Sequence, residues 1–464
     1  MKGFSKDAFR EIVKESRSPK NSVTKASFES VAFDSVTGNQ GAILGRVFNE
    51  SNKVKRFSHV EHQLQKEIRP YFDKQNINSV SIGDHPDFIY LAGTESVENH
   101  HVCSLFLDIK NSTALSFRYD LKDVVWIKNS ILRAASEIVR SMDGNVHRFM
   151  GDALLAFFGD KSNTSENSII NAINCCSVLE SYMVNTFIPV LVEEGFDARD
   201  LGFRIGLDYG KDEEVLWASY GFSEVFEVTA TSFYVDVASK LQSMARKNTT
   251  MLGANIIAAI DFPGEFTSKK KIMKDGEQVD VDTLNRTYID KEGKALRYKI
   301  RELKVSSYRD LLPLDHGVRA SLPGSSLVFN ESITFKCYLV APDGVKTEYK
   351  SVSSALSKKQ NLNFQLTIMK SLYVGSTNFP LTAFFEKRNY GVEAQLREDA
   401  GVFEKGSEQV TLSKQAVSNS FFFPGKTIDV PESTLYRGLH TMQVIVKDAL
   451  NVIIFKNIIG VYVE

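Results

Sequence analysis

The segment "FLDIKNST", residues 106–113, decides the fold, because an apolar run ends abruptly at an acid there. Residues 101–109, "HVCSLFLDI", have the apolar content of a buried strand, and Asp108 lies near its carboxyl end. A carboxylate at this position can hold a divalent cation, and the loop after it can bind phosphate oxygens through amides and hydroxyls. The residues that follow have this character: Lys110, Asn111, Ser112 and Thr113.

The chain after this segment alternates between helical and strand patterns. Residues 121–142 predict an amphipathic helix, which we expect to end at Asp143-Gly144. Residues 145–159, "NVHRFMGDALLAFFG", predict two short strands around a turn at Gly151-Asp152. The apolar positions of the helix recur at helical spacing, and they are Val124, Ile127, Ile131, Ala135, Ile138 and Met142.

Further along, a helix is expected over residues 166–187, strands over 202–210 and 215–221, and a helix over 232–247. The resulting β-α-β-β-α-β order is ferredoxin-like, and it predicts an α+β fold. In that arrangement the first strand and the following hairpin are neighbours. Asp108 and Asp152 can therefore reach one site, although each alone also suits a simpler role, as a helix cap or a turn residue.

Two carboxylates beside phosphate oxygens suit hard octahedral ions such as Mg²⁺ or Mn²⁺. Two such ions can activate an attacking oxygen and neutralise a leaving pyrophosphate. The pair of acids, in this order along the chain, therefore predicts a metal site for Asp108 and Asp152.

Three regions are expected from the change of pattern along the chain. Residues 1–97 mix helix signals with polar loops and form an N-terminal extension. Residues 98–310 form the α+β domain, with a basic insertion near 263–295. Residues 325–464 consist of short alternating runs separated by turn residues, which predicts an antiparallel β-sandwich-like domain.

Composition limits the classes of function. The 464-residue chain has a net charge of −1, which argues against direct nucleic-acid binding or a membrane-surface role. We expect no apolar run long enough to span a bilayer, and the charged start has no signal-peptide pattern. The four cysteines lack CxxC spacing, so we expect reduced, buried thiols and a cytoplasmic protein.

The stretches "FLDIKNST", "RFMGDALLAFFG", "GFRIGLDYG" and "VTATSFYVDVASKL" together resemble the class III nucleotide cyclase domain, over roughly residues 98–260. The resemblance implies a homodimer with active sites at the interface. Asp108 and Asp152 would bind two divalent cations, Mn²⁺ or Mg²⁺, aided by the Ile109 carbonyl. Phe106 and residues 110–113 would contact the nucleoside triphosphate, whose ribose 3′-hydroxyl attacks the α-phosphorus to give a 3′,5′-cyclic nucleotide and pyrophosphate.

One departure from the family concerns the base. Four residues before the second metal aspartate, adenylate cyclases have Lys and guanylate cyclases have Glu, whereas this chain has Arg148. An arginine fork only donates, so it suits the neighbouring O2 and N3 acceptors of cytosine better than uracil, where an N3–H donor separates two acceptors. The family's second base-reading position falls on Thr229. Arg148 therefore favours CTP over UTP, unless it is simply a strand-edge residue in a surface ion pair.

A second departure affects the half of the site that the partner subunit would supply. Where the family has N-x-x-x-R, this chain has Asp236 and Lys240. Lys240 can balance the charge of the phosphates, but an ionised Asp236 would repel the triphosphate. The two residues could instead pair with each other on a helix. The basic run Lys269-Lys270-Lys271 could reach phosphate, although a solvated turn is the simpler interpretation.

The last region resembles the adenylyl/guanylyl cyclase-associated sensor domain, through "FFEKRNYGVEA" and "ESTLYRGLHTMQVIVKDA". A class III cyclase with an unusual base-reading residue and this sensor-like domain resembles the pyrimidine cyclases of the bacterial Pycsar antiphage system. The resemblance implies a product, cyclic CMP or cyclic UMP, that activates a separate effector, commonly a membrane protein. The residues that carry the sensor resemblance are Asn389, Gly391, Glu393, Glu432, Tyr436, Gly438 and His440.

The alternatives are a uridylate cyclase, an adenylate or guanylate cyclase, and a degenerate cyclase domain that senses a nucleotide. Retention of both acids, Asp108 and Asp152, favours an enzyme. The departures at Asp236 and Lys240 keep the sensor alternative open.

Overall fold

Strand β2 (Val102–Lys110) lies inside a seven-stranded sheet with the order β3-β4-β2-β5-β8-β14-β9. The computed structural model describes residues 6–17, 62–222, 225–289, 292–369, 371–374, 377–410 and 425–464. The pairs β2–β4, β3–β4 and β2–β5 are antiparallel, which is the ferredoxin-like arrangement expected from the sequence. The other strands are β3 (Asn145–Met150), β4 (Ala153–Phe158), β5 (Gly202–Gly210), β8 (Thr249–Gly253), β9 (Thr267–Ser268) and β14 (Ile300–Leu303).

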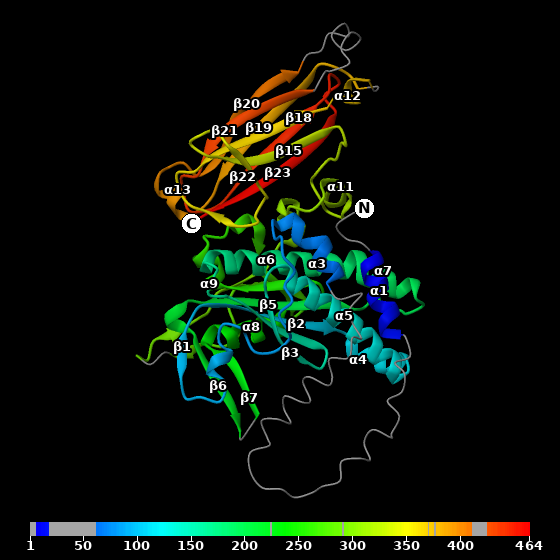
Figure 1. The fold of residues 1–464 in the computed structure, drawn as a ribbon, viewed down its shortest axis with the longest axis vertical. Coiled ribbons are helices and arrows are strands. Elements are labelled where there is room, and N and C mark those ends of the chain that lie inside the picture. The colour runs from blue at the N-terminus through cyan, green and yellow to red at the C-terminus, as the bar shows by residue number, and fades with distance from the viewer. Residues whose placement is uncertain are drawn as a thin grey trace, which may run out of the picture.

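Helices cover both faces of this sheet (Figure 1). Helices α5 (Leu121–Ser141) and α6 (Ser165–Tyr182) share one apolar core with Leu105 and Leu107 of β2. Because side chains alternate along a strand, Phe106 and Asp108 point to the opposite face. That face is covered by α8 (Phe233–Met244), which lies against β5 and β2.

The helix beginning at Ser165 continues beyond the expected end. It passes through a π-helical turn, η4 (Met183–Phe187), into α7 (Ile188–Glu193). Contrary to the sequence expectation, this run of 29 residues is long and apolar enough to cross a membrane by length and composition. Most of it is buried inside the protein, as is typical of a core helix.

The N-terminal helix α1 (Lys6–Arg17) belongs to the same core. Phe9 lies with its ring centroid 4.5 Å from that of Phe187, and the Trp126 indole donates a hydrogen bond to the Val13 carbonyl at 3.0 Å. Residues 1–5 and 18–61 of the expected extension lie outside the described residues.

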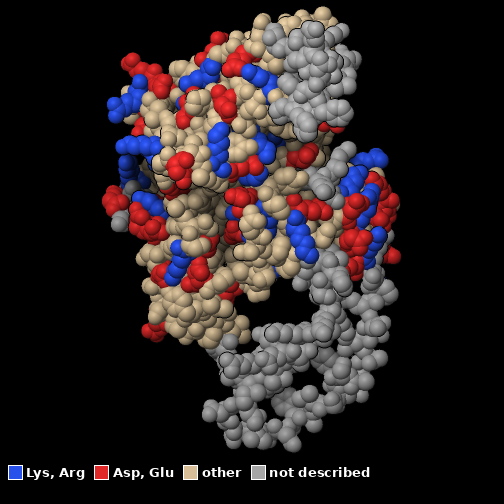
Figure 2. Space-filling model, turned by 45° about the horizontal axis from the view of Figure 1, so that its top comes forward, with Lys and Arg blue, Asp and Glu red and all other residues tan. Residues whose placement is uncertain are grey.

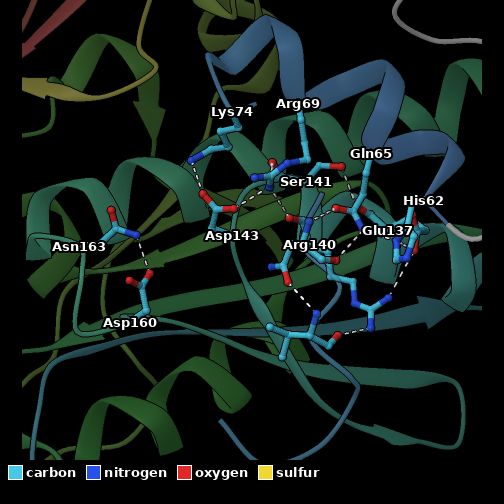
Figure 3. Close-up of polar contacts among 12 residues, drawn as sticks. His62, Gln65, Arg69, Lys74, Glu137, Arg140, Ser141, Asp143, Asp160 and Asn163 are labelled. Atoms are coloured by element: carbon cyan, nitrogen blue, oxygen red, sulfur yellow. Dashed lines mark hydrogen bonds and ion pairs between the residues drawn. The ribbon is translucent and has the colours of Figure 1, made fainter. Parts of the chain in front are cut away.

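Residues 62–80 hold the C-terminal end of α5 (Figure 3). They include α3 (Gln63–Ile68) and a 3₁₀ turn, η2 (Arg69–Phe72). The Arg69 guanidinium donates to the Arg140 carbonyl at 3.0 Å and to the Asp143 carboxylate at 2.6 Å, and Lys74 reaches the same carboxylate at 2.6 Å. Asp143 has a left-handed backbone (φ 59°), which stops the helix where the sequence predicted.

A three-stranded arm, ordered β1-β6-β7, projects from the sheet (Figure 1). Its strands are β1 (Val97–Asn99), β6 (Leu216–Phe222) and β7 (Val225–Thr231). Trp217 fixes the base of the arm, because its buried ring stacks on Phe88 with centroids 4.1 Å apart. Two 3₁₀ turns, η3 (Ile89–Leu91) and η5 (Asp212–Glu214), precede β1 and β6.

The basic insertion forms small hairpins after α9 (Ala254–Ala259) and η6 (Gly264–Phe266). Strand β10 (Lys270–Lys274) pairs with β11 (Glu277–Val281), and β12 (Tyr288–Ile289) pairs with β13 (Ala295–Leu296). The Lys269 ammonium lies 3.8 Å from the Asp282 carboxylate, so the basic run forms an ion pair with an acidic residue of its own hairpin.

The C-terminal region is a sandwich of two sheets, ordered β16-β15-β18-β21 and β17-β23-β22-β19-β20. Its core contains Phe335, Leu366, Phe385 and Val444. The strands are β15 (Ile333–Val340), β16 (Lys346–Tyr349), β17 (Ala355–Leu356), β18 (Asn361–Ile368), β19 (Leu381–Asn389), β20 (Gly401–Val410), β21 (Lys426–Ser433), β22 (Gly438–Lys447) and β23 (Ile453–Val463). Short helical elements accompany them: α10 (Val305–Tyr308), η7 (Arg309–Leu311), α11 (His316–Ser321), α12 (Ser371–Val374) and α13 (Val392–Leu396).

The four cysteines are free and buried, as the sequence predicted. Acidic and basic side chains alternate over the visible face of the molecule, which agrees with the near-neutral net charge (Figure 2).

Candidate active site

The two acids singled out from the sequence lie side by side at one end of the sheet. Asp108 is paired in register with Ala153, the residue directly after Asp152. The Ile109 amide donates a hydrogen bond to the Asp152 carbonyl at 3.2 Å. Gly151 has a left-handed backbone (φ 69°), which forms the tight turn that presents Asp152. Strand register and turn geometry therefore bring the two carboxylates to one place.

Cationic and hydroxyl groups surround these acids. The Arg204 Nε donates to Asp108 Oδ2 at 2.8 Å, and its Nη2 reaches the same oxygen. The Lys128 ammonium lies 3.7 Å from Asp152 Oδ2, which also accepts a hydrogen bond from the Ser112 hydroxyl. The side chains of Asp108 and Asp152 are 15% and 28% exposed, so both acids are largely buried. The contacts balance two negative charges that would otherwise repel each other.

The donor set at this end of the sheet fits a hard divalent cation. It consists of oxygen atoms, and two of its members are carboxylates, which Mg²⁺ and Mn²⁺ prefer. The neighbouring amine and guanidinium would then be free to turn toward phosphate, because a metal ion would take over the neutralisation of Asp108 and Asp152.

The residues after Asp108 have different surroundings. Phe106 is half-buried and packs against the apolar cluster that contains Phe157 and Trp217. Asn111 has a left-handed backbone (φ 65°), and its amide donates to the Asp200 carbonyl at 3.0 Å. Lys110 is half-buried and Thr113 is exposed beside the acids. Only Ser112, within the run 110–113, contacts either acid through its side chain in the described residues.

The base-reading candidate Arg148 is tied to the arm. It lies on β3, is 42% exposed, and forms an ion pair with Glu227 on β7. Glu227 Oε1 also lies 2.7 Å from the His147 Nε2, and burial together with Arg148 lowers the pKa of His147. Thr229 follows Glu227 by two residues, so both point to one face of β7. The structure thus directs Arg148 toward the strand face that carries Thr229.

Asp236 and Lys240 lie apart from this group. Both are exposed on α8, and the described residues contain no ion pair between them. The Lys240 ammonium instead lies 5.6 Å from the centroid of the Tyr288 ring. Because α8 covers the same sheet face as Asp108, its exposed side is turned away from Asp108 and Asp152.

Sequence reasoning missed three members of the site: Lys128, Arg204 and Glu227. Arg204 lies in a segment that was correctly predicted as a strand, but its register against Asp108 is a long-range feature. Glu227 carried a weak signal, since it is an acid two residues before Thr229 with alternating apolar neighbours.

Comparison with known proteins places this arrangement in a family. Residues 315–464 match the family described as the Adenylyl/Guanylyl and SMODS C-terminal sensor domain. A cytidylate cyclase of Escherichia coli is 39% identical over 429 residues, which cover 91% of this chain and 92% of the relative. A cytidylate cyclase of Staphylococcus aureus is 33% identical over 407 residues, which cover 86% of this chain and 88% of that relative. A uridylate cyclase of Rhodovulum is 29% identical over 130 residues, or 27% of this chain and 51% of that protein.

Among solved structures, the adenylyl cyclase CyaB from P. aeruginosa covers 45% of this chain and 95% of its own, with 18% identity and a TM-score of 0.36. The extended identity to the two cytidylate cyclases carries the assignment, and the sensor match agrees with it. The chain is a nucleotide cyclase of class III with a C-terminal sensor domain, and it belongs to the cytidylate cyclase family.

Proposed function

We propose that the protein converts CTP to 3′,5′-cyclic CMP and pyrophosphate. The observation that carries the proposal is the juxtaposition of Asp108 and Asp152 in a chain 39% identical to a cytidylate cyclase over nearly its whole length. In the reaction the ribose 3′-oxygen forms a bond to the α-phosphorus, and the bond from that phosphorus to the bridging oxygen breaks. The β- and γ-phosphates leave together as pyrophosphate, and the 3′-hydroxyl proton is lost to solvent or to a site base.

Asp108 and Asp152, with the Ile109 carbonyl, would hold two divalent cations, which supply charge neutralisation at the phosphates and an activated 3′-oxygen. Lys128 and Ser112 contact Asp152 and lie within reach of phosphate oxygens placed there. Lys110 and Thr113 are further candidates for triphosphate contacts, and Phe106 supplies an apolar wall.

Arg148 and Thr229 would read the base. Glu227 engages one guanidinium nitrogen of Arg148, so the fork is held at a defined orientation rather than sampling solvent. The remaining donors can address O2 and N3 of cytosine, and the Thr229 hydroxyl can donate or accept beside them.

The site would be completed by a second copy of the chain in a homodimer. Asp236 and Lys240 are exposed on α8 and turned away from Asp108 and Asp152 of the same chain, so they are available to a partner. We propose Lys240 as the phosphate-facing residue of that half-site. In the described residues Asp236 forms no ion pair with Lys240, so its carboxylate would face the triphosphate unpaired.

At the level of the cell, we propose a cytoplasmic enzyme whose product activates a separate antiphage effector, such as a membrane protein with a cyclic-nucleotide-binding domain. We also propose the division into an extension over 1–97, a cyclase domain over 98–310 and a sensor-like domain over 325–464. The sensor match at 315–464 supports the last part.

Turnover tests the proposal directly. Purified protein is incubated with Mn²⁺ and each of ATP, GTP, CTP and UTP, and products are identified by mass. We expect cyclic CMP from CTP, and a loss of roughly 10³-fold or more in Asp152→Asn. Asp343→Asn, at an exposed turn of the sandwich, is the matched control and should retain activity.

Other products would revise the proposal in different places. Cyclic UMP would keep the pyrimidine cyclase and contradict the reading of the base by Arg148. Cyclic AMP or cyclic GMP would contradict the pyrimidine assignment. Nucleotide binding without turnover would support the degenerate-sensor alternative or a requirement for an infection signal.

A further inference from the structure

Two adjacent histidines and an aspartate converge at the end of the sheet that is opposite to the acids. His100 and His101 directly precede β2, and Asp212 begins the turn after β5. The His101 Nδ1 lies 3.1 Å from Asp212 Oδ1, and the His100 Nδ1 lies 3.8 Å from the same oxygen. All three potential ligand atoms lie within 4.8 Å of one another. Along β2, Asp108 is roughly 23 Å from His101, so the two clusters are separate.

The separations suit a transition metal. Zn²⁺ binds imidazole nitrogen and carboxylate oxygen at about 2.0–2.2 Å, and tetrahedral angles then place ligand atoms about 3.4 Å apart. The observed values of 3.1 Å and 3.8 Å bracket that distance. Two imidazoles and one carboxylate form a borderline donor set, which favours Zn²⁺, Co²⁺ or Ni²⁺ over Mg²⁺.

Hydrogen bonds outside the cluster fix its members. The His101 amide donates to Asp212 Oδ1 at 2.7 Å, which orients the carboxylate. The His101 Nε2 lies 3.5 Å from the Ser168 hydroxyl, the kind of partner that the second nitrogen of a metal-bound histidine has. The Asn99 amide donates to the Asp212 carbonyl at 3.1 Å and to the Val215 carbonyl at 2.8 Å, so the turn is held in place.

His100 is the residue that a simple hydrogen-bonded clamp leaves unexplained. Its side chain is only 16% exposed, and its Nδ1 faces the Asp212 carboxylate at 3.8 Å, which is longer than a hydrogen bond. Its ring is tilted by 36° relative to the ring of His101 at a centroid distance of 4.2 Å, a contact that would be unfavourable if both rings were protonated.

We propose that His100, His101 and Asp212 form a binding site for one divalent transition metal ion of the Zn²⁺ class. The bound ion would join the start of β2 to the end of β5 and leave at least one coordination position open toward solvent, since Asp212 is 65% exposed. The site is independent of the proposed substrate and of the two cations at Asp108 and Asp152.

Metal titration of the untagged, chelator-treated full chain tests the proposal. The parent is the double variant Asp108→Asn/Asp152→Asn, so that the other carboxylates contribute no binding. Co²⁺ is followed by its visible absorption, and Zn²⁺ by calorimetry. We expect one equivalent of each metal in the parent, with affinity lowered at least about 100-fold by Asp212→Asn and by His100→Ala.

Glu213→Gln, at the exposed neighbouring acid, is the matched control and should bind as the parent does. Thermal melting without metal establishes that each variant is folded. With Zn²⁺ the melting temperature should rise in the parent and in Glu213→Gln, but not in Asp212→Asn. Absence of stoichiometric binding in the parent, or equal affinity in folded Asp212→Asn, would overturn the site.

Discussion

The pKa of one carboxylic acid, Asp208, is controlled by its buried surroundings. Its side chain is completely buried on β5, where it accepts hydrogen bonds from the Tyr298 hydroxyl at 2.8 Å and the Tyr209 amide at 2.9 Å. Burial raises the pKa of Asp208 to about 8, and the two hydrogen bonds only partly oppose it. Gly253 makes the room, because a Cβ there would lie 2.1 Å from the carboxylate.

Asp208 should therefore make stability fall as the pH rises. The folded pKa of about 8 exceeds the ordinary value of 3.8, so between these limits the folded chain keeps a proton that the unfolded chain has lost. The stabilisation is complete below about pH 4 and declines up to about pH 8. Denaturation of Asp208→Asn at several pH values should show a shallower decline than wild type, with Asp343→Asn as the control. An identical slope would contradict the raised pKa.

At the same scale, Glu227 is expected to position Arg148. Glu227→Gln removes the charge that holds the guanidinium but keeps the shape of the side chain. We expect kcat/KM for CTP to fall about tenfold and the preference over UTP to weaken, because a loosely held fork donates less selectively. Steady-state rates with both nucleotides measure this. Glu213→Gln serves as control, and an unchanged CTP/UTP ratio would show that Glu227 is not needed for base reading.

At the scale of elements, the contact between α8 and β5 depends on one glycine. A Cβ at Gly206 would lie 2.1 Å from the Ala238 carbonyl and 2.2 Å from the Gln242 amide nitrogen, both backbone atoms of α8. No side chain can move aside to relieve such an approach. The helix that carries Asp236 and Lys240 is therefore held at a distance that only glycine permits.

Gly206→Ala should consequently destabilise the protein by about 2–4 kcal/mol, since α8 must shift to admit the methyl group. Chemical denaturation of both proteins measures the loss of unfolding free energy. Gly264→Ala is the matched control, because its added Cβ would meet no atom within 4 Å. Equal stability of the two variants would mean that α8 is not tightly seated on β5.

At the scale of the whole molecule, the sandwich rests on α6 (Figure 1). The Asn174 amide donates to the Val352 carbonyl at 2.8 Å and its oxygen accepts from the Tyr308 hydroxyl at 2.9 Å. Two glycines of the sensor motif, Gly391 and Gly438, lie against Asp261 of the cyclase domain. Gly391 (φ 96°) sits so close to Asp261 that a Cβ would lie 2.6 Å from its carboxylate, and the Arg437 guanidinium donates to Glu166 at 3.1 Å. The sensor domain and the cyclase domain are therefore joined by direct contacts.

Asn174→Ala should weaken this junction by about 2 kcal/mol or more, because the Val352 carbonyl and the Tyr308 hydroxyl lose their buried partner. Equilibrium denaturation should show lower stability or separate unfolding of the two parts. Asn185→Ala is the control, since Asn185 donates at 2.7 Å to a carbonyl of its own helical run. Equal effects of the two substitutions would indicate that the junction contributes little.

The sequence by itself determined the local elements and the two acids of the site. The apolar run before Asp108, the helical periodicity over 121–142 and the Gly151-Asp152 turn depend on neighbouring residues, so short stretches of sequence predict them. The order of these elements is ferredoxin-like and predicted the nearness of the acids, and the family resemblance added the roles expected of them.

Only the tertiary structure decided what surrounds those residues. Arg204 meets Asp108, Glu227 meets Arg148, and Asp212 meets His101 because strand register joins positions 79 or more residues apart. A local pattern contains no information on such register. The same reason explains the apolar run from Ser165 to Glu193, whose composition alone fits a membrane span and whose packing between the sheet and the sandwich makes it a core helix.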